Sequence, residues 1–453
     1  MQEKLLALRN FYNSGNTCGY DFRMMQLKAL KAAIIKYESE IFEALFIDLK
    51  KSPEEAYSSE IALVLSELND FIRHLKKWMR PKKVSSNLMN FPSSNKIYHD
   101  PRGVVLIIGP WNYPFQLVML PLVGAIAGGN CVVLKPSELA PATAKIIEKI
   151  IGEIFTENYV LQVNGEGENI IPKMIDHFRF DYIFFTGSVA VGKIINQLAA
   201  KELIPVTLEL GGKSPAVVEF DADIKVAAKR LVMGKFLNVG QTCIAPDYLL
   251  AHASIKEKLI DAIKNDIELF YGNDLSNSYE YGKIINEKRF DKLISYLNEG
   301  AIMYGGKYDK SKLFISPTLI ENVLPDSILM QEEIFGPILP IFTFTTKEEA
   351  LAIINKNKNP LAFYLFTNGP TKWWMENIAF GGGCINNTLF HITNSKLPFG
   401  GVGNSGIGNY HGKYSFDIFT HAKPVLKSPN WFNPSLKYPP FKGKLKWLKL
   451  LLR

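Results

Sequence analysis

Apolar and polar positions alternate at helical spacing through the first part of the chain. Residues 24–35 and 60–68 show this period most clearly. An amphipathic helix needs a surface to cover its apolar face, so we expect these helices to pack on a sheet that forms later in the chain. The polar residues 85–87, followed by short apolar and aromatic pieces up to Tyr98, predict a β-ribbon over residues 84–100.

From Val104 the pattern changes to short buried strands that alternate with helices. Strands of this kind predict a parallel sheet with helices on both faces. A second set of strands starts near Val206 and continues to about Ile407. The expected strands are Val104–Ile108, Cys131–Leu134, Tyr159–Val163 and Tyr182–Phe185, and then Ala216–Phe220, Ile338–Phe342, Ala362–Phe366 and Cys384–Asn386.

These patterns predict an α/β fold with two open α/β domains and a cleft between them. The chain has 453 residues, 47% of them hydrophobic, which is enough for two or three domains. We expect the first domain at residues 1–207 and the second at 208–411. In residues 412–453, we expect a late strand at 417–426 to pair with the early ribbon or with another subunit, and a basic tail to follow.

Residues 103–134 carry no charged side chain and are numerous enough to span a bilayer. Prolines and the pair Gly128-Gly129 divide this stretch, which favours a buried strand, loop, helix and strand over a membrane helix. The N-terminus lacks the features of a secretory signal. Four scattered cysteines without a C-x-x-C pair indicate a reducing compartment, here the cytoplasm, and neither a zinc cluster nor a disulfide framework.

The formal net charge of +8 comes from an excess of basic residues at the end of the sequence. From Ile418 onward there are eight basic residues and no acidic one, and without them the basic residues equal the 44 acidic ones. A neutral body gives no signal for nucleic-acid binding. A helix from Lys444 would place Leu445, Leu448 and Leu452 on one side, which suits peripheral contact with anionic lipid. The same tail can instead dock on a partner subunit or fray.

Three segments carry candidate chemistry. Cys243 is a candidate nucleophile, and a thiol at neutral pH needs a base or favourable dipoles to become a thiolate. Glu209, a single carboxylate between apolar neighbours, is the candidate base, and Asn112 is the candidate donor to an oxyanion. A thiol hydrolase would need a histidine partnered with Cys243, which no motif offers.

A nucleotide site is predicted after the strand that ends near Phe185. Gly187 and Gly192 let the backbone approach a phosphate at the start of a helix, although their spacing does not match the G-x-G-x-x-G fingerprint. A simple strand-to-helix turn explains this segment equally well. Lys135 and Glu138 follow another strand and can bond ribose hydroxyls, or can be solvated loop charges.

Seven segments together resemble the aldehyde dehydrogenase superfamily, in the same order along the chain. The resemblance covers nearly all residues, and details such as Cys243–Asp247 and Phe399–Gly406 are similar to the class 3 or fatty-aldehyde branch. The segments are Pro110–Pro114, Leu134–Glu138, Phe185–Ser188, Leu208–Lys213, Gly240–Cys243, Gln331–Pro337 and Leu397–Gly401.

The resemblance implies a Rossmann-like NAD(P)-binding domain, a catalytic domain and a bridging β element that joins subunits into a homodimer. Cys243 would be the nucleophile, Glu209 the general base, and Asn112 with the backbone N–H of Cys243 the oxyanion hole. The implied reaction oxidises medium- or long-chain aliphatic aldehydes, with aromatic ones as a further class, through a thiohemiacetal and a thioester. An acylating enzyme would pass the thioester to coenzyme A, but Glu209 argues against that alternative.

The resemblance also assigns cofactor residues. Glu333 would bind the nicotinamide ribose beside Phe335, Lys135 and Glu138 the adenosine ribose, and Ser188 the phosphates. A carboxylate at Glu138 repels a 2′-phosphate, which favours NAD with tolerance for NADP. Glu333 is also a second candidate base, or else a surface carboxylate at the start of a helix.

The aldehyde tunnel has three candidate residues. Tyr113 and Leu117 are four apart near the start of a helix and can face the tunnel together, or can be ordinary core. Phe399 is a candidate because its Pro-Phe-Gly-Gly context matches the family.

Overall fold

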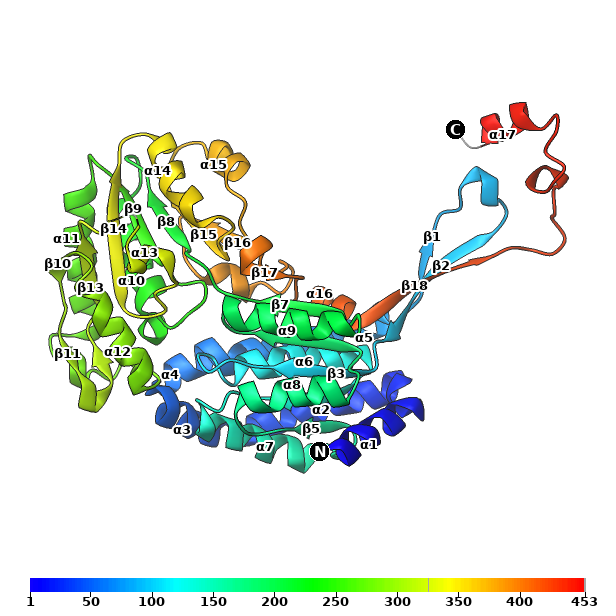
Figure 1. The fold of residues 1–453 in the computed structure, drawn as a ribbon, viewed down its shortest axis with the longest axis horizontal. Coiled ribbons are helices and arrows are strands. Elements are labelled where there is room, and N and C mark those ends of the chain that lie inside the picture. Colours follow the sequence, from blue (N-terminus) through cyan, green and yellow to red (C-terminus); the bar gives the residue numbers. More distant parts are fainter. Residues whose placement is uncertain (325, 452–453) are drawn as a thin grey trace.

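A computed structural model describes residues 1–324 and 326–451 of the chain (Figure 1). Its first sheet has six strands in the order β17-β7-β6-β3-β4-β5, of which all but β17 run parallel. The strands are β3 (Val104–Ile108), β4 (Cys131–Lys135), β5 (Val160–Gln162), β6 (Tyr182–Thr186), β7 (Val206–Glu209) and β17 (Gly406–Ile407).

Helices connect these parallel strands and cover the sheet, as the buried runs of β3, β4 and β6 require. Between strands lie α6 (Gln116–Gly128), α7 (Pro141–Ile154), α8 (Gly167–His177) and α9 (Val189–Lys201). The amphipathic helices at the start of the chain pack on this unit, with α2 and α5 against α6 and α3 against α7. They are α1 (Gln2–Asn13), α2 (Tyr20–Lys36), α3 (Glu38–Leu49), α4 (Pro53–Ala56) and α5 (Ala62–Trp78).

The second sheet has seven strands in the order β10-β13-β14-β9-β8-β15-β16, parallel except for β10. They are β8 (Pro215–Val218), β9 (Tyr248–His252), β10 (Ala301–Tyr304), β13 (Thr318–Glu321), β14 (Ile338–Phe344), β15 (Ala362–Phe366) and β16 (Gly382–Ile385), with β11 (Tyr308–Asp309) and β12 (Phe314–Ile315) as a separate pair. The helices here are α10 (Ile224–Phe236), α11 (Lys256–Tyr271), α12 (Glu287–Tyr296), α13 (Ile328–Gln331), α14 (Lys347–Ile354) and α15 (Lys372–Asn377).

A third, three-stranded sheet projects from the body as an arm (Figure 1). Its strands are β1 (Lys82–Val84), β2 (Ser94–Pro101) and β18 (Thr420–Lys427), which follows α16 (Lys413–Ile418). Strand β18 pairs antiparallel with β2 along its whole length. Of the two expected pairings, the one with the early ribbon is therefore present, although the strand begins at Thr420 rather than at residue 417, because residues 413–418 form α16. Beyond the arm lies α17 (Leu445–Leu451), while Leu452 of the predicted tail face lies outside the described residues.

The two α/β sheets confirm the predicted fold class, but one strand was assigned to the wrong sheet. We expected the second set of strands to start near Val206, whereas β7 pairs parallel with β6 and completes the first sheet. The second sheet begins at Pro215 with β8. Strand partners are distant in sequence, so periodicity alone does not assign β7 to a sheet. The domain boundaries at 207 and 411 stay predictions.

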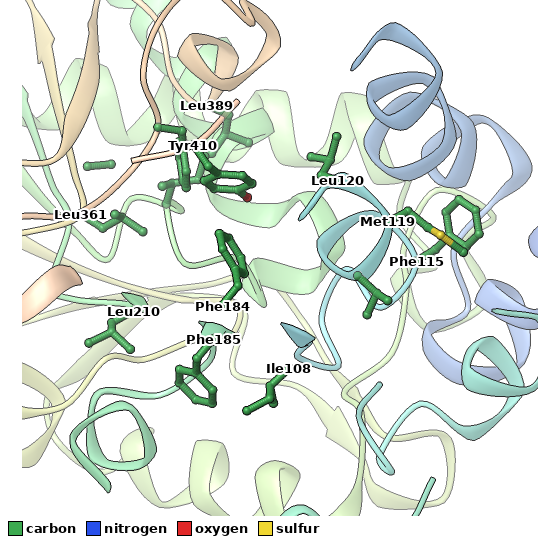
Figure 2. Close-up of a cluster of buried hydrophobic side chains, with 14 of the residues drawn as sticks. Ile108, Phe115, Met119, Leu120, Phe184, Phe185, Leu210, Leu361, Leu389 and Tyr410 are labelled. Carbon is green, nitrogen blue, oxygen red and sulfur yellow. The ribbon is translucent and has the colours of Figure 1, made fainter. Parts of the chain in front are cut away.

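The uncharged stretch folds as β3, α6 and β4 within the body. In residues 1–324 and 326–451, no helix combines the length and apolarity needed to cross a membrane. Aromatic side chains bring the C-terminal part of the chain against the first sheet. Figure 2 shows Tyr410 above Phe184 of β6, with ring centroids 5.0 Å apart and planes at 68°. Both rings belong to the hydrophobic core.

Candidate active site

The predicted site residues follow the carboxyl ends of the first sheet's strands. Strand β3 leads to the turn that carries Asn112, β4 ends at Lys135, β6 leads to Gly187 and Ser188, and β7 ends at Glu209. The chain passes from β3 to β4 and β5 on one side, and then to β6 and β7 on the other. The strand order therefore reverses between β3 and β6, which is where open α/β sheets bind ligands.

Cys243 comes from the opposite end of the second sheet. It lies between α10 and β9, on the amino side of strand β9. Only the five residues 210–214 join strand β7 to β8. The carboxyl ends of the strands in the first sheet therefore lie close to the amino ends of the strands in the second. The cleft predicted between the two sheets is thus formed by the carboxyl ends of the strands of the first sheet and the amino ends of the strands of the second.

One cavity of about 160 Å³ brings most of the predicted chemistry together. Cys243 and Glu209 line it, as do all three predicted substrate residues, Tyr113, Leu117 and Phe399. Its other walls are mainly apolar and come from segments that the sequence did not single out. They include Leu63, Met233, Leu237, Leu361, Leu389, Phe390, Ile392 and Tyr410.

The Cys243 thiol is partly exposed at this cavity. Burial raises the pKa of the thiol, and the carboxyl groups of Glu333 and Glu209 raise it further. The side chain is therefore a thiol at neutral pH and needs a base before it can attack an electrophile.

Glu209 is buried at the end of β7, and neither carboxyl oxygen has a hydrogen-bond partner among the described residues. Burial raises the pKa of this carboxyl well above its usual range. A buried carboxyl with free lone pairs and an elevated pKa is suited to exchange a proton near pH 7.

The turn that holds Asn112 is tied to the segment before Cys243. The Asn112 Nδ2 atom donates to the Gln241 carbonyl oxygen at 3.0 Å, which leaves one amide hydrogen for another acceptor. The hydroxyls of Tyr113 and Thr242 lie 2.6 Å apart. The consecutive residues 112 and 113 thus bind the consecutive residues 241 and 242, and these two contacts hold the turn against the segment before Cys243.

The segment before Cys243 has an unusual backbone. Asn238, Val239 and Gly240 adopt φ values of 51°, 56° and 73°, so two non-glycine residues in succession are left-handed. Each left-handed non-glycine residue costs roughly 1–2 kcal/mol. At Gly240 a side chain would also overlap the Gly336 carbonyl group, so only glycine fits.

Three charged residues hold this strained segment and the Asn112 turn, and the sequence pattern missed them. Lys51, Glu55 and Glu60 come from the N-terminal helical region and reach both segments through hydrogen bonds. In the sequence they are ordinary charges, with Glu55 and Glu60 in a helical stretch and Lys51 in the loop between α3 and α4. Only their complete or partial burial distinguishes them, and burial depends on the tertiary structure.

The predicted adenosine-ribose residues form a pair at the end of β4. Lys135 Nζ lies 2.8 Å from Glu138 Oε2, with the lysine buried and the carboxylate partly exposed. Burial opposes ionisation of Glu138, but hydrogen bonds from Lys135 and two backbone N–H groups lower its pKa below the usual value. The carboxylate is thus ionised and available to accept hydrogen bonds.

The predicted phosphate residues surround the start of α9. The Ser188 side chain caps this helix by accepting from Val191 N at 3.4 Å. A side chain at Gly187 would overlap the Phe185 ring, and one at Gly192 would overlap Leu210. Packing within the protein therefore explains why both positions are glycine, without a bound phosphate. The positive N-terminal end of α9 is the feature of this segment that favours an anion.

Glu333 lies near Cys243, since its carboxyl group contributes to raising the pKa of that thiol. A side chain at Gly211 would overlap its carboxyl group, so the family-like Gly-Gly segment makes room for it. Burial and the neighbouring Asp247 raise the pKa of Glu333 to about 8. Phe335, itself left-handed with φ 48°, packs edge-on against Trp111, with ring centroids 5.2 Å apart.

Phe399 stands between two histidine rings. It stacks with His411 at 5.2 Å and with His391 at 6.0 Å between ring centroids. His411 also lines the cavity, and burial lowers its pKa to about 4. It is therefore a neutral imidazole near pH 7.

Comparisons with known proteins agree with this geometry. Residues 17–425 match the Aldehyde dehydrogenase family. The chain is 47% identical over 457 residues to 4,4′-diaponeurosporen-aldehyde dehydrogenase of Staphylococcus aureus, covering 100% of this chain and 99% of that protein. It is 42% identical to mouse aldehyde dehydrogenase family 3 member A2, covering 100% of this chain and 94% of the relative.

A solved structure of a substrate-bound Staphylococcus aureus AldH has the same fold, with a TM-score of 0.97 and 47% identity over 100% of this chain and 99% of that one. The resemblance read from the seven segments is thereby confirmed, including its class 3-like branch. The chain belongs to the aldehyde dehydrogenase family and is an oxidoreductase that acts on aldehydes.

Proposed function

We propose that this enzyme oxidises medium- and long-chain aliphatic aldehydes, with aromatic aldehydes as a further class, to carboxylic acids. The observation that carries this proposal is the apolar cavity in which Cys243 and Glu209 meet. An apolar lining favours an alkyl chain over a polar one, because polar groups lose their hydration there. The relative from Staphylococcus aureus is named for a 4,4′-diaponeurosporen aldehyde.

The first chemical step is attack of the Cys243 sulfur on the aldehyde carbon. The thiol proton passes to a carboxylate, Glu209 or Glu333, and the carbonyl oxygen becomes an oxyanion in a thiohemiacetal. The free amide hydrogen of Asn112 and the backbone N–H of Cys243 donate to this oxyanion. Donors held in place by packing stabilise the developing charge without reorganisation.

The residues present suit a nicotinamide dinucleotide. The ionised Glu138 beside Lys135 offers acceptors for ribose hydroxyls, the start of α9 offers N–H groups for phosphate, and Thr186 Oγ1 is buried without a partner. NAD, when bound, accepts the hydride that leaves the thiohemiacetal carbon. Glu333 and Phe335 would hold its nicotinamide end. We propose NAD with tolerance for NADP, since Glu138 would repel a 2′-phosphate while Lys135 would attract it.

The second half of the reaction is hydrolysis of the thioester on Cys243. A carboxylate takes a proton from water, the resulting hydroxide adds to the acyl carbon, and the sulfur leaves as the acid forms. Glu209 is the proposed base because it lines the cavity beside Cys243 with both oxygens free. Glu333 remains the second candidate.

We also propose a homodimer in the cytoplasm. The β1-β2-β18 sheet stands away from the body with most side chains of β18 exposed, and such open strand edges favour pairing with another chain. All four cysteines are free, which suits a reducing compartment.

An aldehyde panel tests the proposed substrate class. We expect kcat/KM, measured by NADH formation, to rise from acetaldehyde to octanal and decanal by about tenfold or more, since each buried CH₂ contributes about 0.8 kcal/mol. The same panel with NADP should show lower kcat/KM for every aldehyde. A flat profile across chain lengths would remove the support for Tyr113, Leu117 and Phe399 as substrate residues.

We also propose that the basic tail contacts anionic membrane surfaces, and removal of residues 442–453 tests this contact. Leu445, Trp447 and Leu450 of α17 are exposed beside lysines, and the segment has no acidic residue. We expect the full chain to co-sediment with phosphatidylglycerol vesicles at low salt and the truncated chain to stay in solution. Equal sedimentation of both chains would contradict the proposal, and a loss of dimer mass on truncation would assign the tail to the partner subunit.

A further inference from the structure

We propose that the buried ion pair of Lys51 and Glu60 is a positioning device for the oxyanion donor Asn112. This inference rests on the proposed function, since it takes Asn112 to be that donor. Lys51 Nζ and Glu60 Oε1 lie 2.6 Å apart, and both side chains are completely buried. Each partner also forms hydrogen bonds to the turn that carries Asn112.

Lys51 holds the first part of the turn. Its Nζ donates to the Asn112 carbonyl oxygen at 3.2 Å and lies 4.0 Å from the centre of the Tyr113 ring. The cation therefore contacts two consecutive residues of the oxyanion turn, one through its backbone and one through its ring. Because the Asn112 carbonyl is held in place, the backbone of Asn112 is held too, and this sets the point and direction from which its side chain extends.

Glu60 holds the other end of the turn. Its Oε2 accepts hydrogen bonds from Phe115 N at 2.9 Å and Gln116 N at 3.0 Å, where α6 begins. A carboxylate is favoured at the positive end of a helix. Glu60 lies in a π-helical turn, Tyr57–Ile61, a local distortion found frequently at functional sites.

The same region also reaches the nucleophile segment. Glu55 Oε1 accepts from Asn238 N at 3.0 Å, and Asn238 Nδ2 donates to the Asn112 carbonyl oxygen at 2.7 Å. Asn112 in turn donates to Gln241, two residues before Cys243. One short segment, residues 51–60, which begins in the loop before α4 and ends in the π-helical turn, thus sets the separation between the oxyanion donor and the sulfur.

A gain in folding stability does not by itself explain why the Lys51–Glu60 ion pair is completely buried. Removing two charges from water costs free energy, and buried ion pairs can often be replaced by apolar residues without loss of stability. The pair at Lys51 and Glu60 instead provides directional bonds to three backbone groups of the turn. Directional bonds fix an angle and a distance, which apolar packing does less well.

The double variant Lys51→Met/Glu60→Gln tests the inference in the full chain. It removes both charges together, so no buried charge is left alone. We expect kcat to fall by about tenfold to a hundredfold, as small misplacements of catalytic groups do, while the KM for aldehyde and the Kd for NAD change by less than about twofold. The control is Arg9→Met/Asp181→Asn, a partly buried ion pair outside the cavity, which should keep kcat.

A double-mutant cycle with Asn112→Ala separates positioning from general destabilisation. Asn112→Ala alone should lower kcat by about a hundredfold to a thousandfold. In that background, the ion-pair substitutions should cost less than about threefold more, because the donor that they position is gone. Fully additive losses, or an unchanged kcat in the double variant, would overturn the inference.

Two further outcomes are distinguishable. If Asn112→Ala retains its kcat, the proposed oxyanion role is wrong, and the inference falls with it for that separate reason. If the double variant does not fold, Glu60→Gln is measured alone. The glutamine keeps an acceptor for Phe115 N and Gln116 N, but it cannot form an ion pair with Lys51, which then loses the partner that holds its Nζ against the Asn112 carbonyl oxygen. This variant should lower kcat and leave KM unchanged, and a normal kcat would overturn the inference.

Discussion

Replacement of Cys243 by alanine is expected to abolish NADH formation, lowering kcat by about 10⁴-fold or more. The thioester route needs a sulfur that forms and later releases a bond to carbon, and alanine offers no nucleophile. No other cysteine lines the cavity in the part of the chain that the structure describes. The variant should still fold and bind NAD, because the thiol is partly exposed and alanine leaves its neighbours in place.

The matched control is Cys384→Ala. Cys384 is also partly buried, and its sulfur lies 3.5 Å from His391 Nδ1, but it does not line the cavity. We expect this variant to keep kcat within about threefold, as substitutions outside the reacting groups usually do. NADH production by Cys243→Ala at the control's rate would show that the reaction does not pass through this thiol.

Replacement of Glu209 by glutamine is expected to stop turnover after the first half of the reaction. Loss of a general base lowers kcat by about 10²–10⁴-fold. If thioester hydrolysis is the step that Glu209 serves, one equivalent of NADH should form rapidly and the acyl group should remain on Cys243. Stopped-flow absorbance and intact-protein mass spectrometry measure these two quantities.

Glu333→Gln is the comparison variant. Both carboxyl groups raise the pKa of Cys243, so both lie near the sulfur, but only Glu209 lines the cavity. We expect Glu333→Gln to raise the Kd for NAD and to show no burst of NADH. A burst with Glu333→Gln and normal turnover with Glu209→Gln would reverse the two roles.

The pH profile gives an independent check with a defined sign. A general base acts only when ionised, so kcat should rise with pH as the base loses its proton. Burial raises the pKa of Glu209 well above the usual range, and the pKa of Glu333 is raised to about 8. The rising limb should therefore lie far above pH 4.5 in the wild-type enzyme, and Glu209→Gln should shift its midpoint, because only Glu333 and the Cys243 thiol then titrate in the site.

Much of the fold was predictable from local pattern. The strands Val104–Ile108 and Ala362–Phe366 have the predicted bounds, because continuous apolar runs between helices leave little doubt about their ends. The assignment of β7 was wrong because it depends on hydrogen bonds to β6 and β17, which lie 20 to 200 residues away. A strand's own residues do not say which neighbours it has.

The candidate site divides in the same way. The sequence by itself determined the candidate reactive side chains, Cys243, Glu209 and Asn112, whose roles stay predictions, because thiol, carboxyl and amide chemistry belongs to the residue and its motif. Only the tertiary structure decided that Lys51, Glu55 and Glu60 hold the Asn112 turn and the left-handed segment. Burial turns an ordinary surface charge into a fixed, directional partner, and burial is a property of the assembled layers rather than of any local pattern.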